Sequence, residues 1–148
     1  MNDLIIRPIR EADEAKWRRL WTGYLEYYET SVTEAVYQSS FARLLSADEQ
    51  EFHGLIAELD GKPVGLTHYL IHRHMWKIEN TCYLQDLYAD PDIRGKGIGR
   101  ALIKAVYDAA DLAGTPAVYW LTQEFNYAGR MLYDRVGVKT PFIRYNRS

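Results

Sequence analysis

The chain has 148 residues, of which 47% are hydrophobic and 26% are charged. These proportions are typical of a globular protein, and the length predicts a single domain, residues 1–148, whose core needs neither disulfides nor metals. The net charge of -2 excludes a general electrostatic attraction to nucleic acid or to an anionic membrane. Any basic residue that binds a ligand must therefore act locally.

Cysteine usage and the N-terminal residues predict a cytoplasmic protein. The only cysteine, Cys82, cannot form an internal disulfide, and we expect it to be a small buried side chain in a reducing compartment. Charged residues begin at Asp3, so we expect no signal peptide, and no apolar run approaches the length of a membrane span.

The first third of the chain predicts a short strand followed by two helices. Residues 4–9 form the strand. From Glu11 onward apolar side chains recur every three or four residues, which predicts a helix with one largely aromatic face, made of Trp17, Leu20, Trp21, Tyr24, Leu25 and Tyr28. We expect most of this face to lie in the core. Ser31 and Glu34 have the spacing of a capping box for a second helix that ends near Leu45.

The rest of the chain predicts a mixed sheet with two more helices. Residues 52–59 and 62–72 have the strand period of two, and Asp60-Gly61 between them predicts a hairpin. We expect further strands over 81–89, 117–122 and 142–145. A helix should follow the glycines of residues 95–99 and end at Gly114, and another should run over 126–137 with Asn126 as its cap. This order predicts an α+β fold.

The segment from Arg94 to Arg100 reads RGKGIGR and lies between a predicted strand and a predicted helix. Bare backbone N–H groups at a helix N-terminus, with basic side chains beside them, favour a pyrophosphate ligand. The spacing excludes two common phosphate loops. A Walker loop needs Ser or Thr after Lys96, and a dinucleotide fingerprint needs G-x-G-x-x-G with an acidic residue about twenty positions later.

Two motifs resemble those of the GCN5-related N-acetyltransferases. One is R-G-x-G-[IV]-G after the strand LYADPD. The other is N-x-x-small-x-x-[LF]-Y-x-x-x-G, met here by Asn126, Gly129, Leu132, Tyr133 and Gly137. The resemblance is specific over residues 81–145, where VYWLTQEFN and FIRY are most similar to the yeast histone, polyamine and D-amino-acid acetyltransferase branch and to the diamine acetyltransferases.

This resemblance implies a three-layer α/β/α fold, with a mostly antiparallel sheet and about four helices, that binds acetyl-CoA. It implies direct acetyl transfer to an amine in a ternary complex. The Leu87 N–H would face the thioester oxygen, and Tyr133 would hydrogen-bond the leaving sulfur. The implied cofactor-binding residues are Leu87, Tyr88, Ala89, Arg94, Gly95, Lys96, Gly97, Ile98, Gly99, Arg100, Asn126, Gly129 and Tyr133.

The general base is left open by the sequence. Diamine acetyltransferases have a glutamate where this chain has Gln85, which cannot accept a proton. Asp86 should point to the other face of the strand, Glu124 follows the next strand, and Glu26 or Glu29 on the aromatic helix are further candidates. We rank Asp86 and Glu124 level, beside the alternative that no side chain serves as the base. The residues expected to border the acceptor amine are Tyr24, Tyr27, Tyr28, Glu29 and Gln85. His68, His72 and His74 share a strand face, but we expect no metal there.

Three functions fit these observations. The first is an N-acetyltransferase for a small amine, a polyamine or an amino acid. The second acetylates a protein lysine or N-terminus, and the third is a non-catalytic acyl-CoA-binding regulator. Relatives in the superfamily often pair through their C-terminal strands, which suggests a homodimer.

Overall fold

The computed structural model describes residues 3–93 and 95–148 and contains a five-stranded sheet in the order β1-β2-β3-β4-β5. The first four strands are antiparallel, and β4 and β5 are parallel. The strands are β1 (Leu4–Pro8), β2 (His53–Leu59), β3 (Lys62–His72), β4 (Thr81–Ala89) and β5 (Val118–Tyr119). The helices are α1 (Glu14–Tyr27), α2 (Glu34–Leu44), α3 (Ile98–Leu112) and α4 (Tyr127–Val136).

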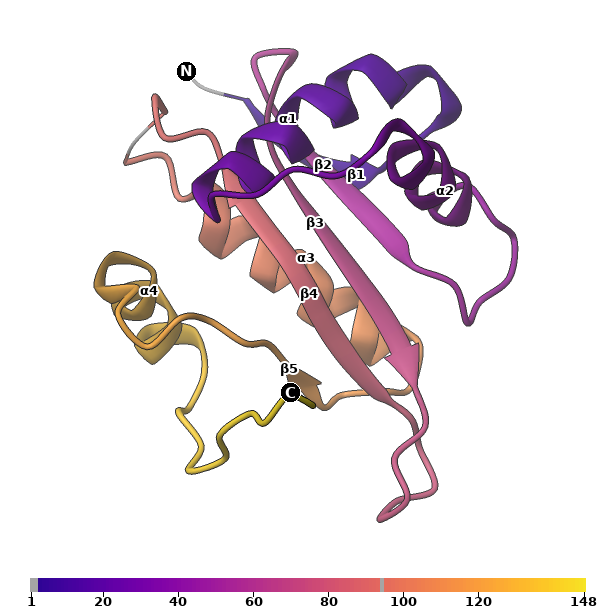
Figure 1. The fold of residues 1–148 in the computed structure, drawn as a ribbon, viewed down its shortest axis with the longest axis vertical. Coiled ribbons are helices and arrows are strands. Elements are labelled where there is room, and N and C mark those ends of the chain that lie inside the picture. The colour runs from indigo at the N-terminus through magenta and orange to yellow at the C-terminus, as the bar shows by residue number, and fades with distance from the viewer. Residues whose placement is uncertain (1–2, 94) are drawn as a thin grey trace.

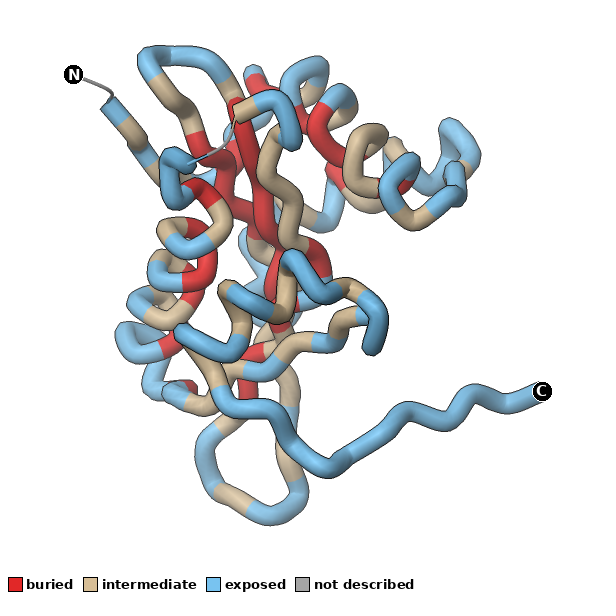
Figure 2. The backbone as a smooth tube through the Cα atoms, turned by 90° about the vertical axis from the view of Figure 1, so that its left-hand side faces the viewer, coloured by how far each residue is buried: buried red, intermediate tan, exposed pale blue. Residues whose placement is uncertain are grey.

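Helices cover both faces of this sheet, which confirms the predicted α+β, three-layer fold (Figure 1). On one face α1 and α2 bury Trp17, Leu20 and Phe41 against Ile56 and Leu66. The other face packs on α3, whose buried side chains are Ile98, Leu102, Ile103, Val106 and Ala110. Figure 2 shows the buried backbone following the central strands and the inner sides of these helices. The prediction that Cys82 is a buried side chain is confirmed, since it is fully buried in the α3 core.

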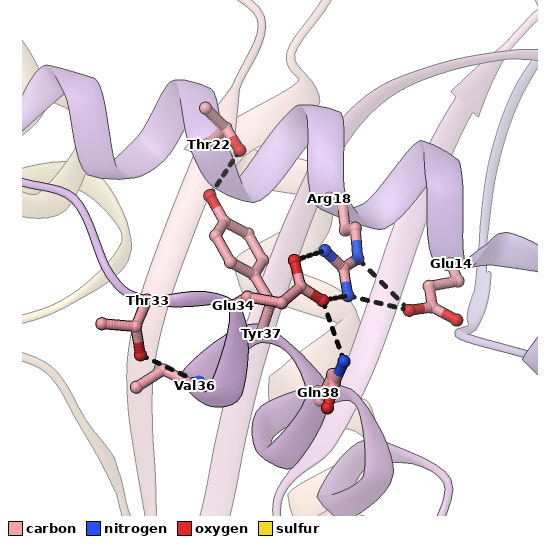
Figure 3. A network of polar contacts seen from close by, with 8 residues as sticks. All are labelled: Glu14, Arg18, Thr22, Thr33, Glu34, Val36, Tyr37 and Gln38. Atoms are coloured by element: carbon pink, nitrogen blue, oxygen red, sulfur yellow. Dashed lines mark hydrogen bonds and ion pairs between the residues drawn. The ribbon is translucent and has the colours of Figure 1, made fainter.

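A network of polar contacts joins α2 to α1 (Figure 3). Arg18 donates two hydrogen bonds of 2.7 Å to the Glu34 carboxylate, and the Thr22 and Tyr37 hydroxyls lie 2.6 Å apart. The predicted capping box of Ser31 and Glu34 is wrong. Glu34 is instead held by Arg18, and Thr33 caps α2 by accepting a hydrogen bond from the Val36 N–H.

The turn between β2 and β3 confirms the predicted hairpin. Asp60 and Gly61 both have positive φ angles, 52° and 81°, which is the conformation that a two-residue turn between twisted strands requires. Further along, Gly114 ends α3 with a φ of 73°, as predicted.

Two predicted strands differ from the structure. The strand expected over 117–122 is reduced to Val118–Tyr119, because it pairs with β4 at two positions and then diverges. Residues 142–145 form no strand, since no neighbouring strand among the described residues offers them hydrogen bonds. No helix among residues 3–93 and 95–148 is both long and apolar enough to cross a membrane.

A buried ion pair holds the start of α1 on β1 and gives a stability prediction. Arg7 donates hydrogen bonds of 2.7 and 2.9 Å to Asp13, which is 3% exposed, and the Arg10 N–H donates a third. These bonds, Arg7 first, lower the pKa of Asp13 from 3.8 to about 2. Because the folded-state pKa is depressed, this stabilisation is present above pH 3.8 and is lost as the pH falls toward 2.

We therefore expect Asp13→Asn to lower the free energy of unfolding at pH 7 by about 2 kcal/mol, measured by urea denaturation. The difference from the wild type should shrink below pH 3.8. Asp111→Asn, at an exposed carboxylate near the end of α3, is the control and should change little. If Asp13→Asn lowered the free energy of unfolding by the same amount at low and at neutral pH, the ion-pair explanation would be contradicted.

Candidate active site

A β-bulge in the middle of β4 organises the site. His68 of β3 pairs with Asp86, whereas the next residue, Tyr69, pairs with Leu84, so Gln85 has no opposite residue. Leu84 packs in the α3 core, so alternation places Gln85 on the α1 face. Asp86 also faces α1, where it contacts Trp21. The prediction that Asp86 points to the other face is therefore wrong, because the bulge resets the alternation.

The same bulge turns two backbone groups of β4 toward an unpaired edge. The Asp90 N–H donates to Val64 of β3, so by alternation the N–H groups of Asp86 and Tyr88 also face β3. Those of Leu87 and Ala89 then face the opposite edge. In the described part of the chain, β5 covers this edge only at Cys82 and Tyr83. Figure 1 shows β5 and α4 diverging from β4 beyond that point.

The glycine-rich segment leads from β4 into α3. Gly95 and Gly97 have φ angles of 70° and 68°, which side chains rarely tolerate. Gly97 is the N-cap of α3 and supplies no side-chain cap, so the first backbone N–H groups of the helix remain available to an anion. Lys96 and Arg100 are exposed beside them, while the Ile98 side chain is buried in the core. Arg94 lies outside the described residues.

Asn126 ties α4 to the rest of the site. Its Oδ1 accepts hydrogen bonds from the Gly129 N–H, at 3.1 Å, and from the Tyr27 hydroxyl of α1, at 3.2 Å. Its Nδ2 donates to Thr122. A Cβ at Gly129 would lie 2.5 Å from the Asn126 amide, which explains the glycine. The prediction that Asn126 caps α4 is confirmed.

Tyr133 lies on α4 with its ring 5.7 Å from that of Trp120. Burial, followed by the neighbouring phenols of Tyr28 and Tyr27, raises the pKa of Tyr133 to about 12. The residue is therefore a neutral hydrogen-bond donor at physiological pH, close to the C-terminal end of α1.

Asp86 is buried among donors on α1 and β3. Its Oδ2 accepts a hydrogen bond from the Trp21 indole, at 3.3 Å, and lies 2.8 Å from His68 Nδ1. Burial, then the charge and the hydrogen bond of Asp86, raise the pKa of Tyr24. Asp86 also contributes to the raised pKa values of Tyr28 and Tyr83, for both of which burial is the largest cause. The structure thus gathers phenols from α1 and β4 around one carboxylate.

Comparison with known proteins shows the family of this chain. The acetyltransferase (GNAT) family profile matches residues 16–138. The D-amino-acid N-acetyltransferase HPA3 of Saccharomyces cerevisiae is 36% identical over 150 residues, covering 100% of this chain and 93% of the relative. The chain belongs to the GNAT acetyltransferase family. It is an acetyl-CoA-dependent N-acetyltransferase.

Other similar proteins agree with this assignment. The bovine (Bos taurus) thialysine N-epsilon-acetyltransferase is 28% identical, over 92% of this chain and 84% of its own. An aminoglycoside N-acetyltransferase, AAC(6')-Iy, solved in complex with CoA, superposes with a TM-score of 0.86 over 100% of this chain and 96% of its own, at 18% identity. At that identity the superposition shows the shared GNAT fold alone.

The geometry of this acetyltransferase fits acetyl-CoA. The amides of its pantetheine arm can pair with the unpaired edge at Leu87 and Ala89, as an added strand would. Its diphosphate can meet the open N-terminus of α3, where glycines keep the backbone accessible. The side chain of Tyr88 does not face this edge, because its ring packs against α1. The contact is close: a Cβ added at Gly23 of α1 would lie 2.5 Å from the Tyr88 hydroxyl.

Other predicted site residues are spread more widely. Glu29, with a φ of 56°, lines an open hollow of about 520 Å³ together with Glu26, Thr30 and Ser31. Glu124 lies on an exposed turn before α4, where its backbone oxygen accepts a hydrogen bond from Arg130.

The three histidines of β3 and its loop have separate partners. His68 is buried beside Asp86, His72 lies 2.8 Å from the Tyr119 hydroxyl, and His74 accepts a hydrogen bond from the Trp76 N–H. Within the described residues, no group of three or more His, Cys, Asp and Glu is placed to hold a metal ion. Neither the strand period nor the motifs indicate the burial of His68, because it depends on Trp17, 51 residues away in the chain.

The left-handed conformation of Gly97 leads to a binding prediction. Valine there should force the backbone away from φ 68° and misdirect the first N–H groups of α3. Losing one hydrogen bond to a charged group weakens binding by about tenfold or more, so we expect at least that loss of CoA affinity by calorimetry. Gly114→Val imposes a similar strain at φ 73° at the other end of α3 and is the matched control. Wild-type CoA affinity in Gly97→Val would refute this loop as the diphosphate site.

Proposed function

We propose that this enzyme transfers the acetyl group of acetyl-CoA directly to a small primary amine: a small amine, a polyamine or an amino acid. The observation that supports this most is that the unpaired edge of β4 leads directly into the open N-terminus of α3. The Asp86 carboxylate lies on the same strand, close to tyrosine hydroxyls of α1 and β4. We also propose that residues 1–148 act as one catalytic domain in the cytoplasm.

The backbone would position the acetyl donor. In this proposal Gly95 to Gly99, with Lys96, Arg100 and the undescribed Arg94, bind the diphosphate. The Leu87 N–H, which faces the unpaired edge by alternation, would donate to the thioester oxygen as negative charge develops there. A single donor of this kind contributes about 2.7–4 kcal/mol to lowering the barrier.

Tyr133 would stabilise the leaving thiolate through its hydroxyl. With a pKa of about 12 it holds its proton more tightly than a thiol of pKa about 8.5. It is therefore proposed as a hydrogen-bond donor to the sulfur, and the attacking amine supplies the proton that the thiolate finally takes.

The acceptor amine must lose a proton before it can attack. For an amine of pKa about 10.4, the neutral form costs about 4.6 kcal/mol at pH 7. Among the candidate bases we favour Asp86, because it is buried against Trp21 of α1, whereas Glu124 lies on an exposed turn. Tyr27, Tyr28, Glu29 and Gln85 are proposed to border the amine.

Similar proteins favour an amino acid among the possible acceptors. The yeast relative is named for D-amino acids and the bovine relative for thialysine. A peptide or protein amine is the second candidate, and a non-catalytic acyl-CoA-binding role is the third. A thiol-release assay with D-amino acids, thialysine, polyamines and a lysine peptide distinguishes them, because a binding module would hold CoA without releasing thiol.

We expect Tyr133→Phe to lower kcat by roughly 10²-fold, the lower end of what one positioned hydrogen-bond donor contributes, while the dissociation constant for acetyl-CoA stays within about twofold. Tyr127→Phe, on the exposed side of the same helix, is the control and should retain wild-type turnover. Equal losses of turnover and of cofactor affinity in Tyr133→Phe would instead assign Tyr133 to packing.

The C-terminal segment supports a homodimer, which we also propose. Phe142, Ile143 and Tyr145 are 80%, 76% and 86% exposed, and Figure 2 shows the segment running away from the body of the protein. A second copy would give this apolar segment the strand partner that it lacks within the described chain.

This proposal predicts that Ile143→Asp converts a dimer into a monomer in light scattering after size exclusion. Leu112→Asp, at a 93% exposed position at the end of α3, is the matched control and should remain dimeric. A wild type that is monomeric at all concentrations, or an Ile143→Asp dimer, would exclude pairing through this segment.

A further inference from the structure

Four side chains form a continuous buried chain beneath the proposed acceptor site. Trp17 and Trp21 of α1, His68 of β3 and Asp86 of β4 are all less than 9% exposed. His68 and Asp86 are directly opposite each other in the β3–β4 register, at the bulge. The rings of Trp17 and Trp21 are stacked with centroids 5.1 Å apart, and both lie about 6 Å from that of His68. Because these rings lie so close together, the His68 side chain has little rotational freedom.

The hydrogen bonds fix which nitrogen of His68 carries the hydrogen. The Trp17 indole N–H can only donate, and it donates to His68 Nε2 at 2.9 Å. Nε2 is therefore the acceptor, so Nδ1 carries the hydrogen and donates it to Asp86 Oδ2 at 2.8 Å. If Nε2 were also protonated, its hydrogen would point directly at the indole hydrogen of Trp17. The hydrogen bond from Trp17 therefore keeps the imidazole neutral.

A neutral imidazole has a particular consequence for Asp86. The donors to this carboxylate are the His68 N–H and the Trp21 N–H, and neither of them carries a positive charge. The carboxylate is thus held in place without being neutralised by a cation. Both geometrically defined bonds end on Oδ2, so neither engages Oδ1.

We propose that the Trp17–His68 pair is a positioning device that holds Asp86 as an uncompensated negative charge for the acceptor amine. This inference rests on the proposed function and deepens it. The ammonium proton passes to the Asp86 carboxylate, so the amine becomes neutral and Asp86 becomes a carboxylic acid. His68 touches no substrate and acts only through Asp86.

Two substitutions at His68 separate positioning from packing. In His68→Asn the amide can replace Nδ1 as the donor to Asp86 but leaves Trp17 without an acceptor. In His68→Gln the amide oxygen can replace Nε2 as the acceptor for Trp17 but loses the donor to Asp86. Each variant loses one buried hydrogen bond, so both should melt at a lower temperature than the wild type.

Activity should distinguish the two variants. A positioned proton acceptor contributes roughly 10²–10⁴-fold, so we expect His68→Gln to lose about tenfold or more in kcat/KM for the amine. The KM for acetyl-CoA should not change. His68→Asn should lose at most about threefold, as the donor to Asp86 is restored. His53→Gln, at a histidine of β2 stacked on Tyr69, is the matched control.

Equal losses in both His68 variants, alongside an active wild type, would overturn the positioning role and leave the proposed function intact. No thiol release by the wild type with any amine would overturn the proposed function and this inference with it. If neither variant folds, the imidazole nitrogen shifts of the wild type decide by NMR. They should show hydrogen on Nδ1 of a neutral His68, and hydrogen on Nε2 would refute the proposal.

Discussion

The structure depends on how β4 is paired. Along one edge β4 pairs with β3 along its length, interrupted by the bulge at Gln85, and along the other edge β5 pairs with it at two residues and then diverges. The bulge at Gln85 shifts the alternation by one residue, so that Leu87 and Ala89 present their N–H groups to the open edge. The strand then runs into the glycine segment and the uncapped N-terminus of α3. In our proposal, one strand thereby supplies backbone donors for the amide-rich arm of acetyl-CoA and leads directly to the site for its phosphates.

The same bulge links the edge of β4 that is proposed to bind acetyl-CoA to the side that is proposed to bind the acceptor amine. By turning Asp86 toward α1, it brings a carboxylate of the central strand under the aromatic helix. Residues at the start of α1, such as Trp17, lie in the core, whereas the tyrosines of its last turns, whose rings contact one another, are proposed to border the acceptor amine. The hydrogen bond from Tyr27 to Asn126 joins this helix to α4, and so connects the proposed acceptor side to Tyr133, the proposed donor to the leaving thiolate.

Features set by local sequence were predictable, and those set by pairing between distant strands were not. The Asp60-Gly61 turn, the aromatic stripe of α1 and the Asn126 cap each depend on neighbouring residues, and the structure confirms them. The glycine-rich segment between β4 and α3 was also predicted correctly, because its position depends on its own residues. The bulge depends on the register between β3 and β4, so strict alternation gave the wrong face for Asp86. The burial of His68 depends on Trp17, 51 residues away. The predicted final strand is absent because no strand of the described residues lies beside it.

Backbone amide NMR during a titration with CoA tests the central claim most directly, because it reads the N–H groups themselves. The account predicts that the amides of Leu87 and Ala89 and those of the first turn of α3 shift together and become protected from hydrogen exchange. The β1–β2 edge should be unaffected. Saturating CoA that leaves the β4 amides unchanged, or that perturbs only residues on α2 and β1, would contradict it.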